Sequence, residues 1–209
     1  MKVKYNFFSF LYDLIDVLYF NHKKSSPRTA LLKFISNSPT RVLDVCAGTG
    51  TNSIVIAKNM VNTQLTALDL SVGMLKIAQK KYQKSQVENI ETLIADACNM
   101  SLLDNSFDIV LISLVLHEIE KDMQKAILTE AKRVLSNDGK IIVIEWAQPK
   151  SRFQRMMFSL IKTLEPQEFK NFLHADLNTY FHTFGLNVLE KHSCDYTHVF
   201  VLTKKHIAT

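Results

Sequence analysis

The sequence predicts an α/β fold: a mostly parallel sheet with helices on both faces. From residue 41 onward, short apolar runs alternate with stretches of helical periodicity, which is typical of a parallel sheet whose crossovers are helices. Several of the runs are apolar along their whole length, as expected of strands that are covered on both faces. The chain has 209 residues, of which 47% are hydrophobic and 22% charged, so it is long enough and apolar enough to form a sizeable core.

The central part of the chain supplies five strands and three helices. The expected strands are residues 41–46, 64–70, 90–96, 107–113 and 140–146. The expected helices between them are residues 51–60, 71–84 and 119–135. Ser71 is of a residue type that caps helices, and Asn137-Asp138-Gly139 is a stop signal before the fifth strand.

The two ends depart from this alternation. Apolar residues fall at helical spacing near the N-terminus and again after residue 147, in two sets: Phe8, Leu11, Tyr12, Ile15, Leu18, Tyr19, Ala30, Leu31, Phe34 and Ile35; and Phe153, Met157, Leu160, Ile161 and Leu164. The chain then finishes with two strand-like runs, 186–193 and 197–205, which predict a hairpin. We therefore expect residues 1–209 to form one domain with an N-terminal helical cap (1–38), a core (41–146), a helical cap insertion (147–184) and a C-terminal β-hairpin (185–205).

Cysteine usage and hydropathy favour the cytoplasm. Cys46, Cys98 and Cys194 are dispersed and odd in number, which does not indicate a disulfide framework. The N-terminal apolar run is interrupted by Asp13 and Asp16 and fits neither a signal peptide nor a spanning helix. The formal charge of +5 is carried by scattered lysines, so a solvated surface is a simpler interpretation than an anionic partner.

Two of the chain's five glycines, Gly48 and Gly50, lie between the first strand and the following helix. At such a turn glycine permits positive φ angles and lets a ligand approach the backbone closely. The amides that begin the helix would then face the ligand. A tight turn without a ligand is the alternative interpretation of this pair.

An acidic residue ends the next strand. Asp69 follows Gly48 by 21 residues, a position from which a carboxylate can accept hydrogen bonds from both hydroxyls of an adenosine ribose. The alternative is that Asp69 helps to cap the helix near Ser71. The glycine pair and the carboxylate together favour an adenosine-containing ligand.

Two further residues bear on which ligand this is. Ser53 occupies the slot of the third glycine in the G-x-G-x-x-G pattern of dinucleotide sites, which argues against NAD. Asp44 lies in the first strand just before the loop, where a carboxylate disfavours a phosphate and favours a cation. S-adenosylmethionine carries an α-ammonium and a sulfonium, and Asp44 would act on that end directly or through water.

Four ordered motifs resemble the class I S-adenosylmethionine-dependent methyltransferases. They are "VLDVCAGTGTNS", "ALDLSVGMLKIAQKK", "ADACNMSLLDNSFDIV" and "EAKRVLSNDGKIIVIEW", which cover residues 41–146, roughly half of the chain. The branch they resemble contains the methyltransferases of ubiquinone and menaquinone biosynthesis and their small-molecule relatives. The resemblance implies a Rossmann-like seven-stranded sheet whose last strand is antiparallel, and a cofactor, S-adenosyl-L-methionine, that leaves as S-adenosyl-L-homocysteine.

The resemblance also implies roles for individual residues. Asp44, Gly48 and Gly50 would hold the methionine end, and Asp69 would bind the ribose. Ser71 and Met74 would flank the adenosine, Asp96 and Ala97 would meet the adenine, and Leu114 would approach the methyl donor. Asn52 and Ser53 depart from the glycine-rich form of the loop, which leaves their contacts open.

His117 is the candidate catalytic residue. It follows the fourth strand, and an imidazole can take a proton from an acceptor at neutral pH. The alternative is a structural histidine that is hydrogen-bonded to backbone. "HEIEK" lacks the second histidine of a zinc-protease motif, and the histidines show no metal-ligand spacing, so no metal is expected. Glu145, Trp146 and Gln148 close the fifth strand; one of them is a candidate for hydrogen-bonding the substrate, while Trp146 can instead cover the core.

The acceptor is expected to be a small molecule of apolar, quinone-like or lipid-like character. No Asn/Asp-Pro-Pro-aromatic motif and no Pro-Cys pair follows the fourth strand, which disfavours nucleic acid. Residues 152–173 predict a capping helix, with an apolar pocket or a docking face for a membrane or protein as alternatives. A weaker resemblance of "ISLVLHEI", "IEWAQPK" and "CDYTHV" to methyltransferases associated with corrinoid proteins leaves a protein partner open. A NAD-type oxidoreductase and a non-catalytic binding protein are the competing hypotheses, and the sequence leaves open the oligomeric state and the accepting atom.

Overall fold

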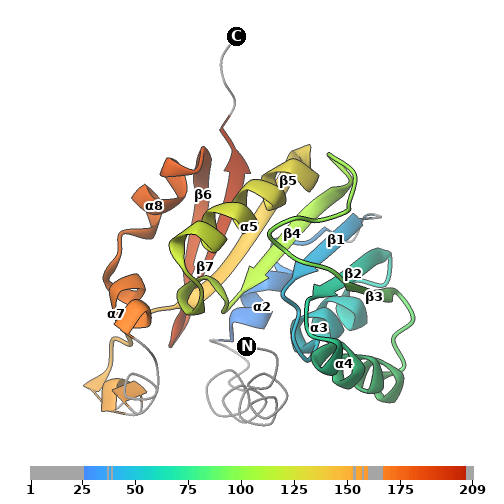
Figure 1. The fold of residues 1–209 in the computed structure, drawn as a ribbon. Helices are drawn as coiled ribbons and strands as arrows, with labels where there is room; N and C mark the ends of the chain where they lie inside the picture. Colours follow the sequence, from blue (N-terminus) through green and yellow to red (C-terminus); the bar gives the residue numbers. More distant parts are fainter. Residues whose placement is uncertain are drawn as a thin grey trace.

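The computed structural model describes residues 26–36, 38, 40–152, 154–156, 158, 159 and 167–205. Its strands form one seven-stranded sheet in the order β3-β2-β1-β4-β5-β7-β6 (Figure 1). The strands are β1 (Thr40–Val45), β2 (Thr63–Asp69), β3 (Ile90–Ile94), β4 (Phe107–Ser113), β5 (Leu135–Trp146), β6 (Leu186–Ser193) and β7 (Thr197–Lys204). β7 pairs antiparallel with both β5 and β6, and the remaining pairs are parallel. This confirms the expected fold class, including the antiparallel last strand.

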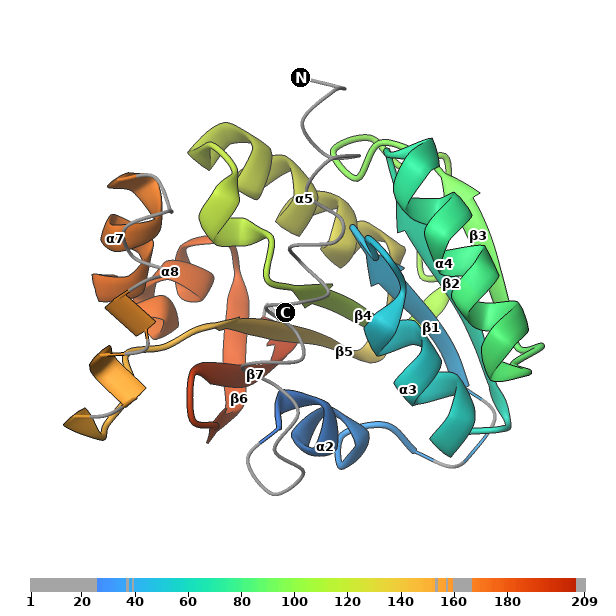
Figure 2. The same cartoon turned by 90° about the horizontal axis from the view of Figure 1, so that it is seen from below.

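Helices cover both faces of the sheet, as Figure 2 shows in a view along the sheet. They are α2 (Pro27–Leu32), α3 (Thr51–Asn59), α4 (Val72–Ser85), the 3₁₀ helix η1 (Leu116–Glu118), α5 (Lys121–Val134), α7 (Gln167–His174) and α8 (Leu177–Thr183). Side chains of α2, α3 and α4 form one core cluster with the sheet. Side chains of α5, α7 and α8 form another on the opposite face. The central strands are therefore apolar along their length because both of their faces are buried.

Local sequence signals explain where the helices begin. Ser71 is the N-cap of α4, and its hydroxyl accepts a hydrogen bond of 3.3 Å from the backbone N–H of Met74, as predicted. In α5 the buried residues Ile127, Leu128, Ala131 and Val134 recur at three- and four-residue spacing, so one stripe of the helix faces the sheet.

The order of the strands reverses at β1. β1 lies between β2 and β4, so the chain runs outward from β1 to β3 and then crosses back to β4. The loops that leave β1 and β4 consequently diverge at the carboxyl edge of the sheet. In open α/β sheets this reversal is the place where ligands bind.

The expected boundary between the third core helix and the fifth strand was wrong. β5 begins at Leu135, directly after α5, so Asn137-Asp138-Gly139 lies inside the strand instead of ending a helix before it. The register of its pairing with β4 shifts from Phe107↔Leu135 to Ile109↔Lys140. More residues of β5 than of β4 lie between these two pairs, so the start of β5 is irregular. A Cβ on Gly139 would stand 2.9 Å from the carbonyl oxygen of Asp108, so the irregularity needs glycine there.

Two of the expected helical stripes lie outside the described residues. They are the stripe between Phe8 and Tyr19 and the one formed by Phe153, Met157, Leu160, Ile161 and Leu164. In the first expected cap, the described part contains α2, whose Ala30 and Leu31 are buried. In the second, α7 and α8 are present. Within the described part of the chain, no helix combines the length and the apolar character that crossing a bilayer requires.

Candidate active site

The candidate site residues gather at the carboxyl edge of the sheet. Asp44 is in β1 one residue before its end, Asp69 ends β2, and the segment after β4 carries Leu114 and His117. The parallel register of β1 with β2 and β4 places these strand ends side by side.

The loop after β1 turns by positive φ angles at alternate positions. Cys46, Gly48 and Gly50 have φ values of 57°, 57° and 74°. A Cβ on Gly48 would meet no atom within 4 Å, so its Cα faces open space. A Cβ on Gly50 would stand 2.3 Å from the hydroxyl oxygen of Tyr82 in α4, so Gly50 lets the loop pack against that helix. The two glycines therefore have different roles. At Gly50 the absence of a side chain lets the loop pack against Tyr82, and at Gly48 it leaves the space beside the loop open.

Asp69 joins the loop to the start of α4. One carboxylate oxygen accepts a hydrogen bond of 2.8 Å from the backbone N–H of Gly48. The other oxygen accepts a hydrogen bond of 2.8 Å from the backbone N–H of Ser71. The contact with Ser71 is the capping alternative, and it exists alongside the contact with the glycine loop. A carboxylate has about four lone-pair sites, so both oxygens can also accept bonds from a ligand. Burial raises the pKa of Asp69, while the two amide contacts lower it.

Asp44 is buried and bonded to the helix that follows the loop. Its carboxylate accepts a hydrogen bond of 2.6 Å from the hydroxyl of Ser53, and Asp44 is only 2% exposed. The pKa of Asp44 is raised to about 7: burial raises it most, the Ser53 hydroxyl lowers it in part, and the negative charge of Asp69 adds to the increase. A cation at the loop would offset both unfavourable effects on the ionised form. Ser53, whose contact the sequence left open, is thus the direct partner of Asp44.

The remaining cofactor candidates lie around the start of α4 and after β3. Met74 is in the first turn of α4 and its side chain is buried. Asp96 is exposed and its carboxylate accepts 2.8 Å from the backbone N–H of Cys98, which makes a turn, while Ala97 is buried. Leu114 has a φ of 55°, and its backbone N–H donates 2.8 Å to the carbonyl of Ile144 in β5.

His117 is buried, and its imidazole is bonded to a carboxylate. Its Nδ1 lies 2.7 Å from Oε2 of Glu145, and the two side chains are 2% and 0% exposed. The other oxygen of Glu145 accepts 2.9 Å from the backbone N–H of Leu116. The ring of Phe169 in α7 stands edge-on to the imidazole at 5.2 Å. Nε2 of His117 lies 3.7 Å from Glu118, whose side chain is 22% exposed.

A second set of bonds holds the segment that carries His117. Gln124 in α5 donates to the carbonyls of Leu116 (2.7 Å) and Ile119 (3.0 Å), and its own oxygen accepts 2.7 Å from the hydroxyl of Tyr180 in α8. The segment is thus positioned by α5 and α8 as well as by the end of β5.

The three residues that close β5 have different surroundings. Glu145 faces inward to His117, so it is not placed to hydrogen-bond a substrate directly. Trp146 packs with Phe158, Phe169 and Tyr196 in a buried cluster and covers the core. Gln148 lies 3.0 Å from Nδ1 of His174 in α7.

Sequence reasoning missed the partners that lie far away along the chain. Glu145 was considered for the substrate and not for His117, 28 residues away. Tyr82 and Gln124 were not singled out at all. The helical spacing of Tyr82 places it on the buried stripe of α4, but periodicity does not say which loop it meets.

The residues present fit an adenosine cofactor with a cationic end. The open space at Gly48 is one that a Cβ would occupy, and Gly48 donates its backbone N–H to the carboxylate of Asp69. A second carboxylate, that of Asp44, lies one residue before the end of β1 and is bonded to Ser53 in α3. Within the described ranges, no group of three or more histidine, cysteine, aspartate or glutamate side chains is arranged to hold a metal ion.

The sequence of the chain is similar to that of known methyltransferases. Residues 42–139 match the model of a methyltransferase domain. The demethylmenaquinone methyltransferase of Listeria welshimeri is 37% identical over 111 residues, which are 53% of this chain and 46% of that protein. The enzyme of the same name from Oceanobacillus iheyensis is 31% identical over 145 residues, 69% of this chain and 60% of that protein. The chain spans about half the length of the curated relatives it matches.

The fold itself has close counterparts among solved structures. The crystal structure of a SAM-dependent methyltransferase from Aquifex aeolicus superposes with a TM-score of 0.70 at 20% identity, covering 90% of this chain and 92% of the other. This likeness concerns the fold alone. Together with the motifs, the match over residues 42–139 shows that this part of the chain is a methyltransferase domain, similar in sequence to the demethylmenaquinone methyltransferases and in fold to a SAM-dependent methyltransferase.

Proposed function

We propose that the protein transfers a methyl group from S-adenosylmethionine to a small-molecule acceptor. The observation that carries the proposal is the contact between Gly48 and Asp69, which brings an accessible carboxylate to the edge of an open, glycine-lined space. The buried carboxylate of Asp44 adds negative charge beside that space, which suits a cationic methionine end and disfavours a pyrophosphate.

In this proposal each cofactor residue acts on one part of the ligand. Gly48 and Gly50 shape the loop around the methionine end, and Asp44 acts on its ammonium through its charge, because Asp44 is itself bonded to Ser53. Asp69 accepts from the ribose hydroxyls. The other residues then lie along the adenosine and toward the methyl donor: Ser71, Met74, Asp96, Ala97 and Leu114.

His117 takes the proton from the acceptor. When bound, S-adenosylmethionine supplies an electrophilic methyl group on a sulfonium, so the chain has to align the acceptor, exclude water and remove a proton where the nucleophile begins protonated. Glu145 holds Nδ1 of His117 and would stabilise the imidazolium that forms. This arrangement leaves the proton transfer to Nε2, on the side of Glu118.

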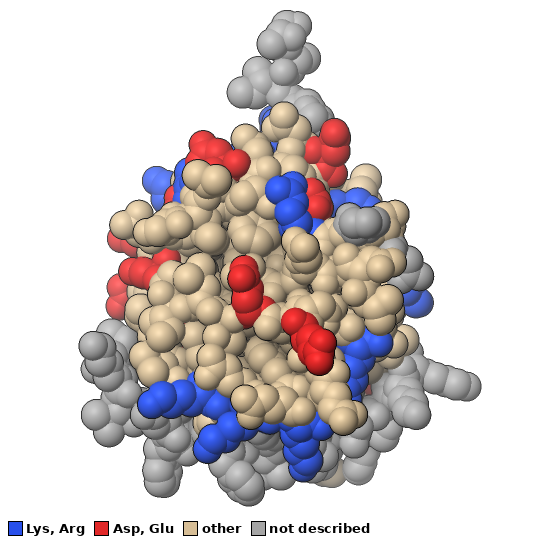
Figure 3. Space-filling model, turned by 90° about the vertical axis from the view of Figure 1, so that its right-hand side faces the viewer, with Lys and Arg blue, Asp and Glu red and all other residues tan. Residues whose placement is uncertain are grey.

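A quinone-like or other aromatic acceptor is favoured among small molecules. The relatives from Listeria and Oceanobacillus are named for demethylmenaquinone, and the aromatic cluster of Trp146, Phe158, Phe169 and Tyr196 borders the segment of Leu114. Nucleic acid is disfavoured on the face beyond β3: positive side chains line its lower margin and occur again near the top, but acidic side chains stand between them, so this face offers no continuous basic surface to a phosphate backbone (Figure 3).

Two alternatives make different predictions. A NAD-type oxidoreductase would bind NAD in preference to S-adenosylmethionine. A methyltransferase that works on a protein-bound acceptor, such as a corrinoid protein, would bind S-adenosylmethionine but show no turnover with free small molecules.

Titration calorimetry with S-adenosylmethionine, S-adenosylhomocysteine and NAD tests the proposal. We expect the two sulfur nucleotides to bind and NAD not to. Asp69→Ala should weaken S-adenosylhomocysteine binding by at least about tenfold, or about 1.4 kcal/mol. Asp108→Ala is the matched control, because Asp108 also accepts a backbone N–H, that of Arg41, but at the opposite edge of the sheet. Absence of binding by either sulfur nucleotide would exclude the proposed function.

The acceptor is then sought with a donor that carries a labelled methyl group. A set of quinols, phenols and apolar amines is incubated with the protein, and label transfer is measured. Label on a quinol-type acceptor supports the proposed substrate class, and label only on a different class contradicts it.

A further inference from the structure

We infer that Arg133 is a positioning residue for the adenine end of the cofactor site, acting through the connection between β3 and β4. The inference rests on the proposed function, specifically on the assignment of Asp96 and Ala97 to the adenine. Arg133 lies in the last turn of α5 and is not among the proposed cofactor residues.

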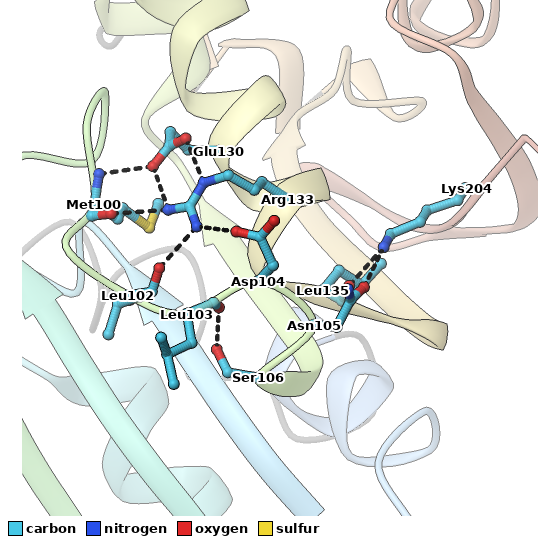
Figure 4. Close-up of polar contacts among 10 residues, drawn as sticks. All are labelled: Met100, Leu102, Leu103, Asp104, Asn105, Ser106, Glu130, Arg133, Leu135 and Lys204. Atoms are coloured by element: carbon cyan, nitrogen blue, oxygen red, sulfur yellow. Dashed lines mark hydrogen bonds and ion pairs between the residues drawn. The ribbon is translucent and has the colours of Figure 1, made fainter.

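Arg133 binds the connection with its whole guanidinium (Figure 4). Nη2 donates 2.8 Å to the carbonyl of Met100, and Nη1 donates 2.7 Å to the carbonyl of Leu102 and 2.6 Å to the carboxylate of Asp104. Nε and Nη2 each donate 2.8 Å to the carboxylate of Glu130. Glu130 in turn accepts 2.7 Å from the backbone N–H of Met100. Arg133 and Glu130 therefore hold both polar backbone groups of Met100.

This clamp acts on a segment that has no regular backbone pairing of its own. Residues 95–106 form neither helix nor strand. Backbone carbonyls that do not belong to a helix or sheet need other partners when they are removed from water. A planar guanidinium can serve two carbonyls and two carboxylates at once, whereas an ammonium acts as a single point charge.

The clamp is connected to the proposed adenine residues by a short, ordered turn. The carboxylate of Asp96 accepts a hydrogen bond from the backbone N–H of Cys98. The backbone carbonyl of Asp96 accepts one of 3.1 Å from the backbone N–H of Asn99. Met100 follows directly, and its side chain is 4% exposed. The position of Asp96 is thus set from one side by β3 and from the other by Met100, which Arg133 and Glu130 hold.

The far end of the connection is anchored separately. The backbone N–H groups of Asn105 and Ser106 donate 3.0 and 2.8 Å to the carbonyls of Arg133 and Val134. Lys204 of β7 donates 3.1 Å to the side chain of Asn105 (Figure 4). Removing the Arg133 guanidinium would therefore release the part of the connection near Asp96 without detaching the part that enters β4.

The pKa shifts of Arg133 and Glu130 agree with a tightly held ion pair. The pKa of Glu130 lies below its ordinary value, mainly because Arg133 hydrogen-bonds to it, and the pKa of Arg133 is raised, first by Glu130 and then by Asp104. The side chains of Arg133 and Glu130 are 29% and 15% exposed, so the pair is shielded in part from salt.

The test compares two ligands that differ only in the base. The base of S-adenosylhomocysteine carries an exocyclic amine that can donate a hydrogen bond to the carboxylate of Asp96, and S-inosylhomocysteine carries an oxygen, which cannot donate, in its place. The unchanged protein should prefer the adenine ligand. Arg133→Lys and Arg133→Ala should weaken S-adenosylhomocysteine binding by about tenfold, equal to about 1.4 kcal/mol, and bring the affinity ratio of the two ligands close to one.

Arg41→Ala is the matched control. Arg41 also makes a bidentate contact with a carboxylate, that of Asp108, but at the amino end of the sheet. It should leave the affinity ratio unchanged. Arg133→Lys and Glu130→Gln, checked for folding by circular dichroism, serve where Arg133→Ala does not fold.

The ratio separates positioning from general destabilisation. A variant that only destabilises the fold weakens both ligands equally and keeps the ratio, which would overturn the inference, as would a lack of base preference in the unchanged protein. Failure of the unchanged protein to bind S-adenosylhomocysteine at all would overturn the proposed function and this inference with it.

Discussion

Nδ1 of His117 lies 2.7 Å from Oε2 of Glu145, and both side chains are buried at the carboxyl edge of the sheet. The pair follows from topology: β4 and β5 are parallel neighbours, so the end of β5 lies beside the segment that leaves β4. Because Glu145 also accepts from the backbone of Leu116, the carboxylate fixes both the imidazole ring and the turn that carries it. A histidine held in this way presents the same nitrogen in every molecule.

Substitution of either partner should lower turnover more than cofactor binding. We expect His117→Asn to lower kcat by about 100-fold or more, as for loss of a general base. Glu145→Gln should also lower kcat, because the neutral amide no longer stabilises an imidazolium. The measurements are kcat and the affinity for S-adenosylhomocysteine; the affinity should stay within about twofold, a difference of roughly 0.4 kcal/mol. Unchanged turnover in His117→Asn would eliminate the proposed base.

The same pair should matter for folding. Glu145→Ala removes the partner of a buried imidazole and of a buried backbone N–H. Breaking a buried pair in this way typically lowers the free energy of unfolding by about 3–5 kcal/mol. Denaturant unfolding of Glu145→Ala and Glu145→Gln, compared with the unchanged protein, measures this loss, and a loss below about 1 kcal/mol, the net worth of an ordinary hydrogen bond, would contradict it.

The two loop glycines should respond differently to alanine. Gly50→Ala should lower the stability clearly, because the new Cβ would stand 2.3 Å from the Tyr82 hydroxyl at a φ of 74°. Gly48→Ala should lower it only by about 1–2 kcal/mol, the backbone strain at positive φ, since its Cβ meets nothing within 4 Å. Its main effect should be on the cofactor, whose space the methyl group enters.

Thermal denaturation and calorimetry distinguish these two effects. For Gly48→Ala we expect the loss of S-adenosylhomocysteine affinity to exceed the loss of stability when both are expressed as free energies. The opposite order, or an unchanged affinity, would mean that the open space at Gly48 is not the ligand site.

Asp44 should make the protein sensitive to pH near neutrality. Its pKa is about 7 in the folded chain against an ordinary value of 3.8. The folded state therefore binds more protons between these values, so the free energy of unfolding should fall as the pH rises from about 4 to 7 and remain low above it. The α-ammonium of the ligand favours the ionised carboxylate, so affinity for S-adenosylhomocysteine should instead rise with pH through about 7.

The measurements are the thermal midpoint of the ligand-free protein from pH 5 to 8 and the affinity over the same range. Asp44→Asn should flatten both dependences. Asp108→Asn is the control, because the pKa of Asp108 is lowered by Arg41 and it does not titrate in this window. Unchanged slopes in Asp44→Asn would contradict the assignment.

Gly139 should tolerate no side chain. A Cβ there would stand 2.7 Å from Leu135 Cδ1 and 2.9 Å from the backbone oxygen of Asp108, which cannot move without disturbing β4. We expect Gly139→Ala to lower the free energy of unfolding by about 1–3 kcal/mol, as for overpacking of a core. Denaturant unfolding measures the change, and an unchanged midpoint would show that the strand start can shift.

The sequence by itself determined what local patterns control. The strand and helix order follows from apolar runs, periodicity and caps such as Ser71, and each is decided within a few residues of the chain. Gly48, Gly50 and Asp69 could be singled out because the turn after a strand and the end of the next strand have fixed places in an α/β unit. The predicted start of β5 was wrong because the same residue types occur at the end of a helix and in an irregular strand.

Only the tertiary structure decided which distant groups meet. Ser53 with Asp44, Tyr82 with Gly50, Glu145 with His117, and Arg133 with the backbone of Met100 and Leu102 are contacts between different elements. Such contacts depend on strand order, helix rotation and side-chain direction together, and sequence spacing specifies none of these by itself. The sequence therefore indicates the kind of ligand, whereas the folded chain sets the charge, orientation and support of the groups around it.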